Sequence, residues 1–280
     1  MLETKVDNQE AINLVLEKRF TNGGDYWATA DGKLAVGSPF STLEALQILY
    51  ELGLDTGHEA VEGAAALLLD SWRADGRYRL APTGTLYPCH TANVTRVLCR
   101  LGFIEDHRVQ ASLTHLAGSQ YEDGGWRCNK FAFGRGPETE FSNPGVTLFV
   151  LDAFRFSKEL EQNPELARAV ETLLDHWTVR APIGPCQFGM GTLFMQVEYP
   201  FLRYNLFSYV YVLSFYPVAR RDARFQEAFK ALQAKLDENG QMIVERPNRK
   251  LATIPGFLKG RPSQPATSRF MEILDNLDNQ

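Results

Sequence analysis

The stretch that decides the fold is LAGSQYEDGGW, residues 116–126. It contains a frame in which Leu116 is followed by Gln120, then by Gly124 and finally by Trp126. Its Glu-Asp-Gly-Gly segment is a turn signal, because glycine accepts positive φ angles and aspartate bonds its own backbone. The frame therefore predicts a helix that ends in a tight turn.

The same frame recurs along the chain. An earlier copy, LLDSWRADGRY, has Gly76 at the turn, and a later copy, LQAKLDENGQM, has Gly240. A degraded copy follows Trp177 and has Ala181 in place of the glycine, while Gly32 closes a partial first unit. Each interval is long enough for two helices and a connection, so the chain reads as a repeat protein.

Each repeat contains two kinds of helical segment. The segment before a turn is amphipathic: Val61, Ala65, Leu68 and Trp72 lie on one face of a predicted helix. The segment before that one is apolar nearly all round, which is typical of a helix buried on more than one side. These apolar segments are predicted as inner helices at residues 43–52, 92–101, 146–156 and 206–215.

Alternating inner and outer helices either close into a ring or continue as an open array. We predict an all-α fold, an α/α-toroid of four to five repeats, with residues 1–280 forming one domain. The C-terminal helix predicted at residues 267–277 is placed to close the ring against the first repeat.

Leu116, Gln120, Gly124 and Trp126 match the QW motif of squalene-hopene cyclase and oxidosqualene cyclase repeats. The chain thus resembles the prenyltransferase and squalene-oxidase repeat superfamily and, at YPCHTANVTRVLCRLG and EDGGWRC, a group of its bacterial members. The resemblance implies a toroid and, as an activity, a cyclase or transferase acting on an isoprenoid-like substrate. The DxDD acid motif of the cyclases and the Asp-x-Cys zinc motif of the prenyltransferases are both absent from the sequence, so the catalytic residues stay unknown.

In such a ring the loops before the inner helices gather at one mouth. These loops are rich in reactive and aromatic groups, and the mouth candidates are Cys89, His90, Asn93, Cys128, Glu198, Tyr199, Arg203 and Tyr204. Several helix N-termini pointing at one opening make it electropositive, which suits a phosphate or diphosphate.

The mouth thiols allow three interpretations. Cys89, His90 and Cys128 have the ligand types of a zinc site, with Glu198 or water in the fourth place. Cys89 could instead act as a nucleophile activated by a helix N-terminus and a neighbouring histidine. The simplest interpretation is that the cysteines are small buried hydrophobic residues.

The C-terminal third adds two features. An aromatic cluster spans residues 199–216 and is interpreted either as core or as the lining of a cavity that binds an isoprenoid. Residues 246–265 are rich in arginine, lysine, proline and glycine and predict a long loop, interpreted as a flap over the cavity.

Composition excludes some partners. The net charge of -5 gives no electrostatic reason to expect nucleic acid as a partner. No apolar run approaches the roughly 20 residues of a transmembrane helix. The polar N-terminus does not read as a secretory signal, so the predicted location is the cytoplasm.

Three hypotheses for function follow. The first is a prenyltransferase- or terpenoid-cyclase-like protein that binds a hydrophobic or diphosphate-bearing small molecule in a central cavity. The second is a non-catalytic binding or scaffold protein that retains the toroid. The third is a sugar-acting α/α-barrel enzyme, which needs paired carboxylates; the candidates are Glu138, Glu140 and Glu198.

Overall fold

The computed structural model describes residues 8–128, 137–158 and 163–278. Within these ranges the regular structure consists of α-helices and two short 3₁₀ helices, and β-pairing is limited to isolated bridges. No helix of the described residues is both long enough and apolar enough to cross a membrane. The prediction of an all-α fold is confirmed.

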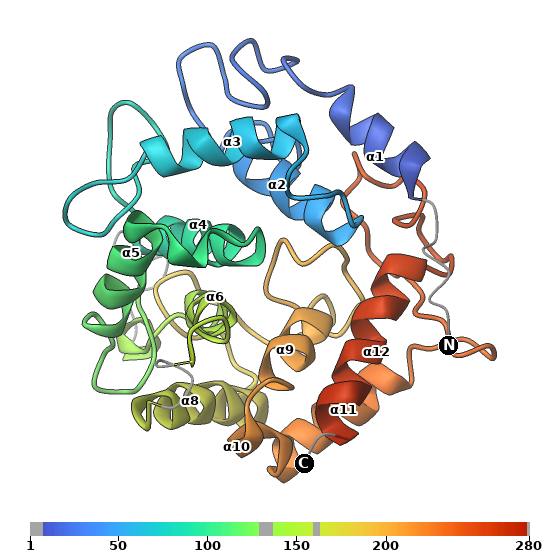
Figure 1. The fold of residues 1–280 in the computed structure, drawn as a ribbon. Coiled ribbons are helices and arrows are strands. Elements are labelled where there is room, and N and C mark those ends of the chain that lie inside the picture. Colours follow the sequence, from blue (N-terminus) through green and yellow to red (C-terminus); the bar gives the residue numbers. More distant parts are fainter. Residues whose placement is uncertain (1–7, 129–136, 159–162, 279–280) are drawn as a thin grey trace.

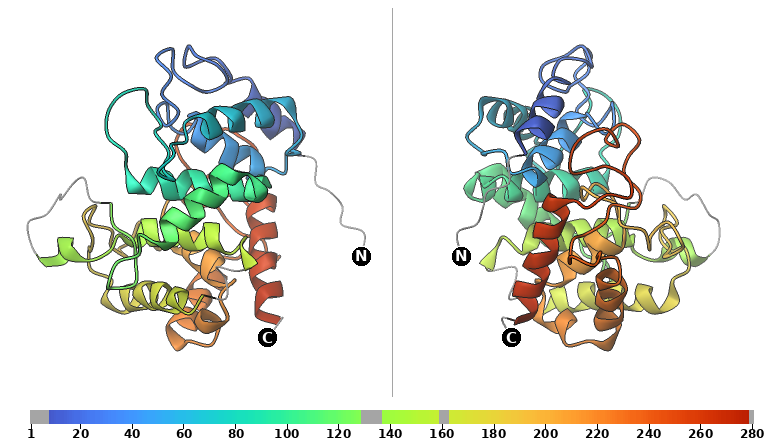
Figure 2. Two further views of the ribbon diagram at one scale, coloured as in Figure 1. Left: turned by 60° about the vertical axis from the view of Figure 1, so that its left-hand side comes forward. Right: turned by 90° about the vertical axis from the view of Figure 1, so that its right-hand side faces the viewer.

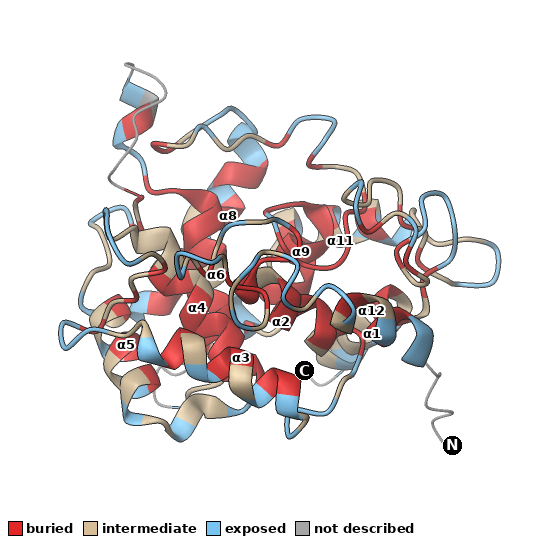
Figure 3. Cartoon of the chain, turned by 90° about the horizontal axis from the view of Figure 1, so that it is seen from above, coloured by how far each residue is buried: buried red, intermediate tan, exposed pale blue. Residues whose placement is uncertain are grey.

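Five helices surround the middle of the molecule (Figure 1). All four predicted inner segments are helical, and the fifth helix is the C-terminal one. Burial is concentrated on the first four of these helices, as the red ribbon of α2, α4, α6 and α9 shows (Figure 3). The inner helices are α2 (Thr42–Glu51), α4 (Pro88–Arg100), α6 (Pro144–Phe154), α9 (Leu206–Leu213) and α12 (Gln264–Asp278).

Each of the first four inner helices is followed by an outer helix that packs against it (Figure 1). Asp106 and Asp222 cap two of these outer helices by accepting the amide hydrogens of Arg108 and Arg224. The outer helices are α3 (Glu59–Asp70), α5 (His107–Ala117), α8 (Glu165–Val179) and α11 (Ala223–Gln233). The remaining helices are α1 (Gln9–Leu16), α10 (Pro217–Arg220), η1 (Phe103–Glu105) and η2 (Pro137–Glu140).

The glycine turns after α1, α3, α5 and α11 share one geometry. At the best copy, Gly124 N donates to Tyr121 O and Tyr121 N donates to Gly125 O, both at 2.9 Å. The same pair of bonds recurs around Gly32, Gly76 and Gly240. The φ angles of the four glycines lie between 73° and 89°, a region that favours glycine, so the repeated glycine has a backbone cause.

Gln120 and Trp126 fix the best turn to its neighbours. Gln120 Nε2 donates to Gly124 O at 2.6 Å and to Glu165 O at 3.0 Å, which ties the turn to the start of α8. Trp126 Nε1 donates to Leu116 O at 2.8 Å, back to the last turn of α5. The two side chains thus join one repeat to the next.

In the degraded copy of the frame, the turn lies at a different residue from the one that the sequence alignment predicted. The alignment put Ala181 at the turn position, but the chain turns later, at Gly184, whose φ is 75°. Ile183 and Phe188 exchange both backbone hydrogen bonds around this later turn. Arg180 ends α8 with a φ of 56°, so the chain has already left the helix before Ala181.

The ring is closed by the C-terminal helix. α12 packs against α9, and Arg269 Nε reaches Glu51 Oε2 of α2 at 2.6 Å. The segment interpreted as a flap is packed in place: Leu251 and Phe257 are fully buried, and the Phe257 ring lies 5.9 Å from that of Tyr199. The loops before α9 and α12 extend to the same side of the ring (Figure 2). This arrangement is an α/α-toroid with four inner–outer pairs and a fifth inner helix among the described residues.

Candidate functional site

A pocket of about 400 Å³ opens at the mouth of the ring, between the first turns of α4 and α6 and the loop before α9. Four of the predicted mouth residues line it together: Cys89, Glu198, Arg203 and Tyr204. We call this pocket the mouth pocket. The rest of its lining is formed by Asn143, Gly145, Val146, Phe149, Cys186, Phe188, Gly189, Leu193, Phe194, Leu202 and Arg246.

Two inner helices start at the mouth pocket. Pro88 and Pro144 occupy first-turn positions of α4 and α6, where a missing amide hydrogen is harmless. Asn143 caps α6 by accepting the amide hydrogen of Val146 at 3.1 Å. Because the N-terminus of a helix carries a partial positive charge, both starts favour a negative group in the pocket.

Charged side chains form one edge of the mouth pocket. Glu198 Oε2 lies 3.4 Å from Arg246 Nη1, and Glu198 Oε1 lies 3.7 Å from Arg203 Nε. Burial raises the pKa of Glu198 above its usual value, although both arginines act in the opposite direction. The arginine side chains remain 37% and 54% exposed, so both can still contact a ligand.

Aromatic rings form another wall. The Tyr204 ring lies 5.1 Å from that of Phe194 and 5.8 Å from that of Phe188. The Tyr204 hydroxyl is satisfied away from this wall, because it pairs with His176 Nδ1 at 2.9 Å. The wall is therefore apolar in character even where a tyrosine contributes to it.

Thiols lie at the end of the pocket formed by α4. Cys89 Sγ and Cys128 Sγ are 3.5 Å apart, although 39 residues separate them in the sequence. The hydrogen bond with Cys128 raises the pKa of Cys89, and burial adds to the effect. Burial also raises the pKa of Cys186, on the same pocket wall, to about 11. Cys89 and Cys186 are thus held mainly in their protonated forms at neutral pH, which argues against Cys89 as a nucleophile activated by a lowered pKa.

The remaining mouth candidates lie outside the pocket lining. The His90 ring packs against Tyr87, with ring centroids 4.9 Å apart. Asn93 Oδ1 accepts a hydrogen bond from Arg96 Nε at 2.6 Å, and the Tyr199 hydroxyl donates to Glu51 Oε2 at 2.8 Å. These three side chains serve packing or the interior of the ring.

Zinc binding was predicted at Cys89, His90 and Cys128. Over residues 8–128, 137–158 and 163–278, no three His, Cys, Asp or Glu side chains are grouped closely enough to hold a metal ion. The two thiols are adjacent and Cys186 lies near them, but the side chains of the described residues are not grouped as a metal site. We derive no chemistry from a metal here, and the zinc site stays a prediction.

The carboxylates considered for sugar chemistry have separate environments. Glu140 Oε2 pairs with Arg127 Nη2 at 3.0 Å on the exposed side of η2. Glu198 faces the arginines of the mouth pocket instead. The side chain of Glu138 lies outside the described residues. Nothing in these contacts indicates a catalytic carboxylate pair.

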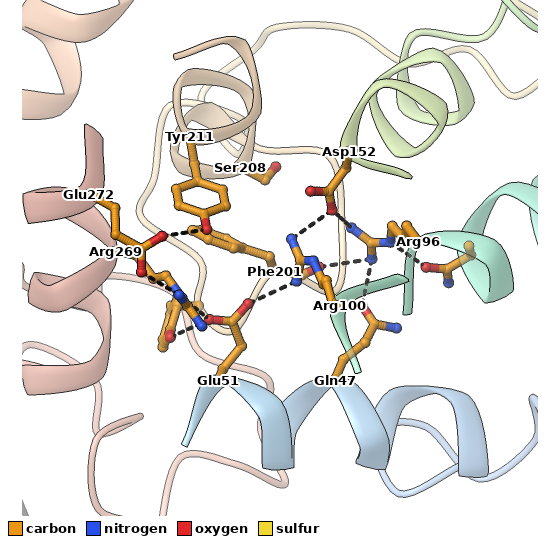
Figure 4. A network of polar contacts seen from close by, with 12 residues as sticks. Gln47, Glu51, Arg96, Arg100, Asp152, Phe201, Ser208, Tyr211, Arg269 and Glu272 are labelled. Carbon is orange, nitrogen blue, oxygen red and sulfur yellow. Dashed lines mark hydrogen bonds and ion pairs between the residues drawn. The ribbon is translucent and has the colours of Figure 1, made fainter. Parts of the chain in front are cut away.

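The middle of the ring is occupied by buried ion pairs, which we call the axial network (Figure 4). Arg100 is its centre: Nη1 lies 2.9 Å from Glu51 Oε1 and Nη2 lies 2.6 Å from Asp152 Oδ2. Arg155 Nε lies 2.9 Å from Asp152 Oδ1. Burial raises the pKa of Asp152, but the three neighbouring arginines, Arg100, Arg155 and Arg96, outweigh it and bring the pKa to about 2.

Arg96 extends the axial network with neutral acceptors (Figure 4). Its Nη2 donates to Gln47 Oε1 at 2.5 Å and to Phe201 O at 3.0 Å, while Nη1 lies 3.5 Å from Asp152 Oδ2. Burial, with Arg100 nearby, lowers the pKa of Arg96 to about 9. The side chain remains protonated at neutral pH and is 1% exposed.

Arg269 connects α12 to the same network. It pairs with Glu51 and with Glu272, whose Oε2 accepts the Tyr211 hydroxyl at 2.7 Å. Glu51 therefore receives three donors, from Arg100, Arg269 and Tyr199. Its pKa is lowered because the arginines outweigh the effect of burial.

The sequence predictions missed the axial network. Side chains occupy the middle of the ring, where a ligand cavity was expected, so the pocket lies at the mouth rather than on the axis. The available signal was the occurrence of Glu51, Arg96, Arg100 and Asp152 in helices otherwise apolar enough to be buried. Charged residues there need partners, because an unpaired buried charge is costly.

Comparison with known proteins gives structural likeness only. No family model and no curated protein sequence matches the chain. One similar solved structure is a variant of the type II terpene cyclase MstE from Scytonema in complex with geranylgeranyl dihydroxybenzoate, with 13% identity and a TM-score of 0.37 over 100% of this chain and 99% of that one. The apo form of that cyclase gives 14% identity and a TM-score of 0.38 over 97% of this chain and 96% of that one. A polysaccharide lyase gives 13% identity and a TM-score of 0.47 over 97% of this chain and 88% of that one.

These similarities are too distant to support an activity. The class of the protein rests on its own helices: four inner–outer pairs and α12 make it an α/α-toroid protein. Within that class its particular features are a filled axis and an open pocket at the mouth.

Proposed function

We propose that the chain binds a hydrophobic small molecule with an anionic group, such as an isoprenoid diphosphate, in the mouth pocket. The volume of about 400 Å³ lies in the range of small-molecule sites. Aromatic and aliphatic side chains offer an apolar wall for the hydrocarbon part of the ligand. The observation that carries the proposal is the pairing of this wall with Arg203 and Arg246 at one edge.

The anionic group has three sources of attraction in this arrangement. Arg203 and Arg246 are partly exposed and donate up to five hydrogen bonds each, which suits phosphate oxygens. The first turns of α4 and α6 add partial positive charge. Glu198 opposes binding when ionised, and its raised pKa reduces that opposition as the pH falls.

Binding is tested by calorimetric titration with farnesyl diphosphate, farnesol and inorganic diphosphate. We expect farnesyl diphosphate to bind more tightly than either of its parts, because it uses both the apolar wall and the arginines. The Arg203→Gln/Arg246→Gln double variant should weaken its binding about tenfold or more, because hydrogen bonds between charged groups are lost. Arg221→Gln, an exposed arginine outside the pocket lining, is the matched control. Equal affinity for all three compounds, or an unchanged double variant, would contradict the proposal.

Whether the bound molecule is transformed separates the two leading hypotheses. A cyclase or transferase converts the ligand, whereas a non-catalytic binding or scaffold protein returns it unchanged. The filled axis favours the non-catalytic alternative, because charges at the centre of the ring are already paired with one another. Mass spectrometry of farnesyl diphosphate after incubation with the purified chain decides between them: a new product supports an enzyme, and quantitative recovery supports a binding protein.

A further inference from the structure

The Cys89–Cys128 pair is held from two separate directions. Cys89 lies in the first turn of α4, which the buried residues of that helix fix in the ring. Cys128 follows Trp126 by two residues, and the Trp126 indole is anchored by its bond to Leu116 O. The contact of 3.5 Å between the two sulfur atoms thus joins two well-packed parts of the chain.

The surroundings of the four cysteines differ. Cys89 is half-buried and lines the mouth pocket, so a small molecule in the pocket can reach it. Cys99, further along α4, is only 2% exposed. Cys186 lines the same pocket and also interacts with Cys128, which adds to the effect of burial in raising the pKa of Cys186. The sulfur atoms of Cys89 and Cys128 lie within 3.5 Å of each other.

We propose that Cys89 and Cys128 are a redox-active dithiol, which a low-molecular-weight disulfide such as glutathione disulfide converts into an intramolecular disulfide through the mouth pocket. This inference is independent of the proposed ligand. The inference concerns the formation of a disulfide at Cys89, a residue that lines the pocket.

The chemistry balances without a metal. The Cys89 thiolate attacks one sulfur of glutathione disulfide, forming a mixed disulfide and releasing one glutathione thiolate. The Cys128 thiolate then attacks Cys89 Sγ, forming the protein disulfide and releasing the second glutathione. The two protein thiols lose two electrons and two protons, and glutathione disulfide is reduced to two glutathione thiols.

Geometry and acidity set the conditions for this reaction. The sulfur atoms must approach from 3.5 Å to the bonding distance of about 2 Å, which requires only a small movement of the two side chains. The raised pKa of Cys89 keeps its thiolate scarce at neutral pH. The rate should therefore increase steadily as the pH rises above neutral.

The test uses the folded full chain, equilibrated with glutathione buffers of increasing disulfide content and then quenched with an alkylating agent. We expect alkylated thiols in the denatured, quenched protein to fall from four to two. Peptide mass spectrometry should identify a Cys89–Cys128 cross-link. Reduction with dithiothreitol should restore all four thiols.

Variants distinguish this pair from its neighbour. Cys128→Ser should abolish the cross-link and leave a mixed disulfide with glutathione on Cys89. Cys89→Ser should abolish both the cross-link and the mixed disulfide at this pair, because Cys128 is only 2% exposed and does not line the pocket. Cys186→Ser, which removes a thiol from the same wall, should leave the cross-link unchanged. A persistent count of four thiols in the most oxidising buffer, or a cross-link through Cys186 in place of either partner, would overturn the proposal.

Discussion

The axial network and the mouth pocket share the inner helices α4 and α6, yet the polar side chains of the two regions have opposite environments. In the axial network Asp152 and Arg100 are at most 2% exposed and paired with each other. In the mouth pocket Arg203 keeps 54% of its side chain exposed and stands 3.7 Å from Glu198. The first arrangement holds helices together, whereas the second leaves charge available to a ligand.

Phe149 is the boundary between these two regions. Its ring lies 3.8 Å from the guanidinium carbon of Arg96 in the axial network, and it also lines the mouth pocket. The axial network thus contributes to the stability of the ring, whereas the mouth pocket is available for ligand recognition. Variants in the mouth pocket should therefore leave the free energy of unfolding nearly unchanged, and folded variants of the axial network should leave the ligand affinity nearly unchanged.

The largest effect is expected from Asp152→Ala. It leaves Arg96, Arg100 and Arg155 without their shared buried carboxylate, which should lower the free energy of unfolding by about 3–5 kcal/mol. Urea denaturation followed by circular dichroism measures this. The control is Asp175→Asn, because the Asp175 carboxylate is 66% exposed and pairs with Arg224 at the surface. This variant should change the free energy of unfolding by less than about 1 kcal/mol. Similar losses in both variants would remove the distinction between buried and surface pairs.

Glu51→Gln should be the next most severe change. It weakens bonds from Arg100, Arg269 and Tyr199, so we expect a loss of about 2–3 kcal/mol. Because Arg269 is on α12, amide hydrogen exchange should accelerate in that helix more than in α4. Uniform acceleration along the whole chain would show that Glu51 does not specifically hold α12.

Acid should destabilise the protein through the axial network. The pKa of Asp152 falls from 3.8 to about 2 on folding, so the stabilisation is complete above the higher value and is lost as the pH drops through the lower one. The shift corresponds to about 2 kcal/mol. Urea midpoints measured between about pH 5 and pH 2 should fall less steeply for Asp152→Asn than for the unmodified chain. Parallel curves would mean that other carboxylates dominate acid unfolding.

The smallest effect on stability is expected at Glu198→Gln, in the mouth pocket. The free energy of unfolding should change by less than about 1 kcal/mol, because the partners Arg203 and Arg246 are partly exposed and burial already disfavours the ionised carboxylate. Affinity for farnesyl diphosphate should increase several-fold, because a negative charge is removed from the pocket. In the unmodified chain the same affinity should rise as the pH falls through the raised pKa of Glu198. A variant that keeps this pH dependence would assign it to another group.

The fold was predictable because its signals are local. Turn glycines such as Gly76 and Gly124 require positive φ, and the nearly continuous apolar character of residues 206–215 shows directly in the sequence. Ala181 was misplaced because the frame counts four residues from Trp177, whereas α8 continues to Val179 and the chain turns only at Gly184. Local patterns do not reveal such a shift.

The site was only partly predictable, because it depends on how distant segments meet. Arg203 and Glu198 are near in sequence and were found together, whereas Arg246 joins them from 48 residues beyond Glu198. Arg96 and Asp152 were overlooked for the same reason: their pairing spans 56 residues. Hydrophobic patterning identifies which helices are buried, but it does not identify which charges neutralise one another inside.

The contact between Arg269 and Glu51 also has a consequence for the size of the ring. Glu51 belongs to the first inner helix and Arg269 to the last, so this ion pair joins the two ends of the ring. It can form only when the two helices lie within the combined length of the two side chains. A further helix pair inserted into the circle would move the two ends apart by about 10 Å, the diameter of a helix. The Arg269–Glu51 ion pair could then no longer form, so a ring with one more helix pair would need a different contact to join its ends.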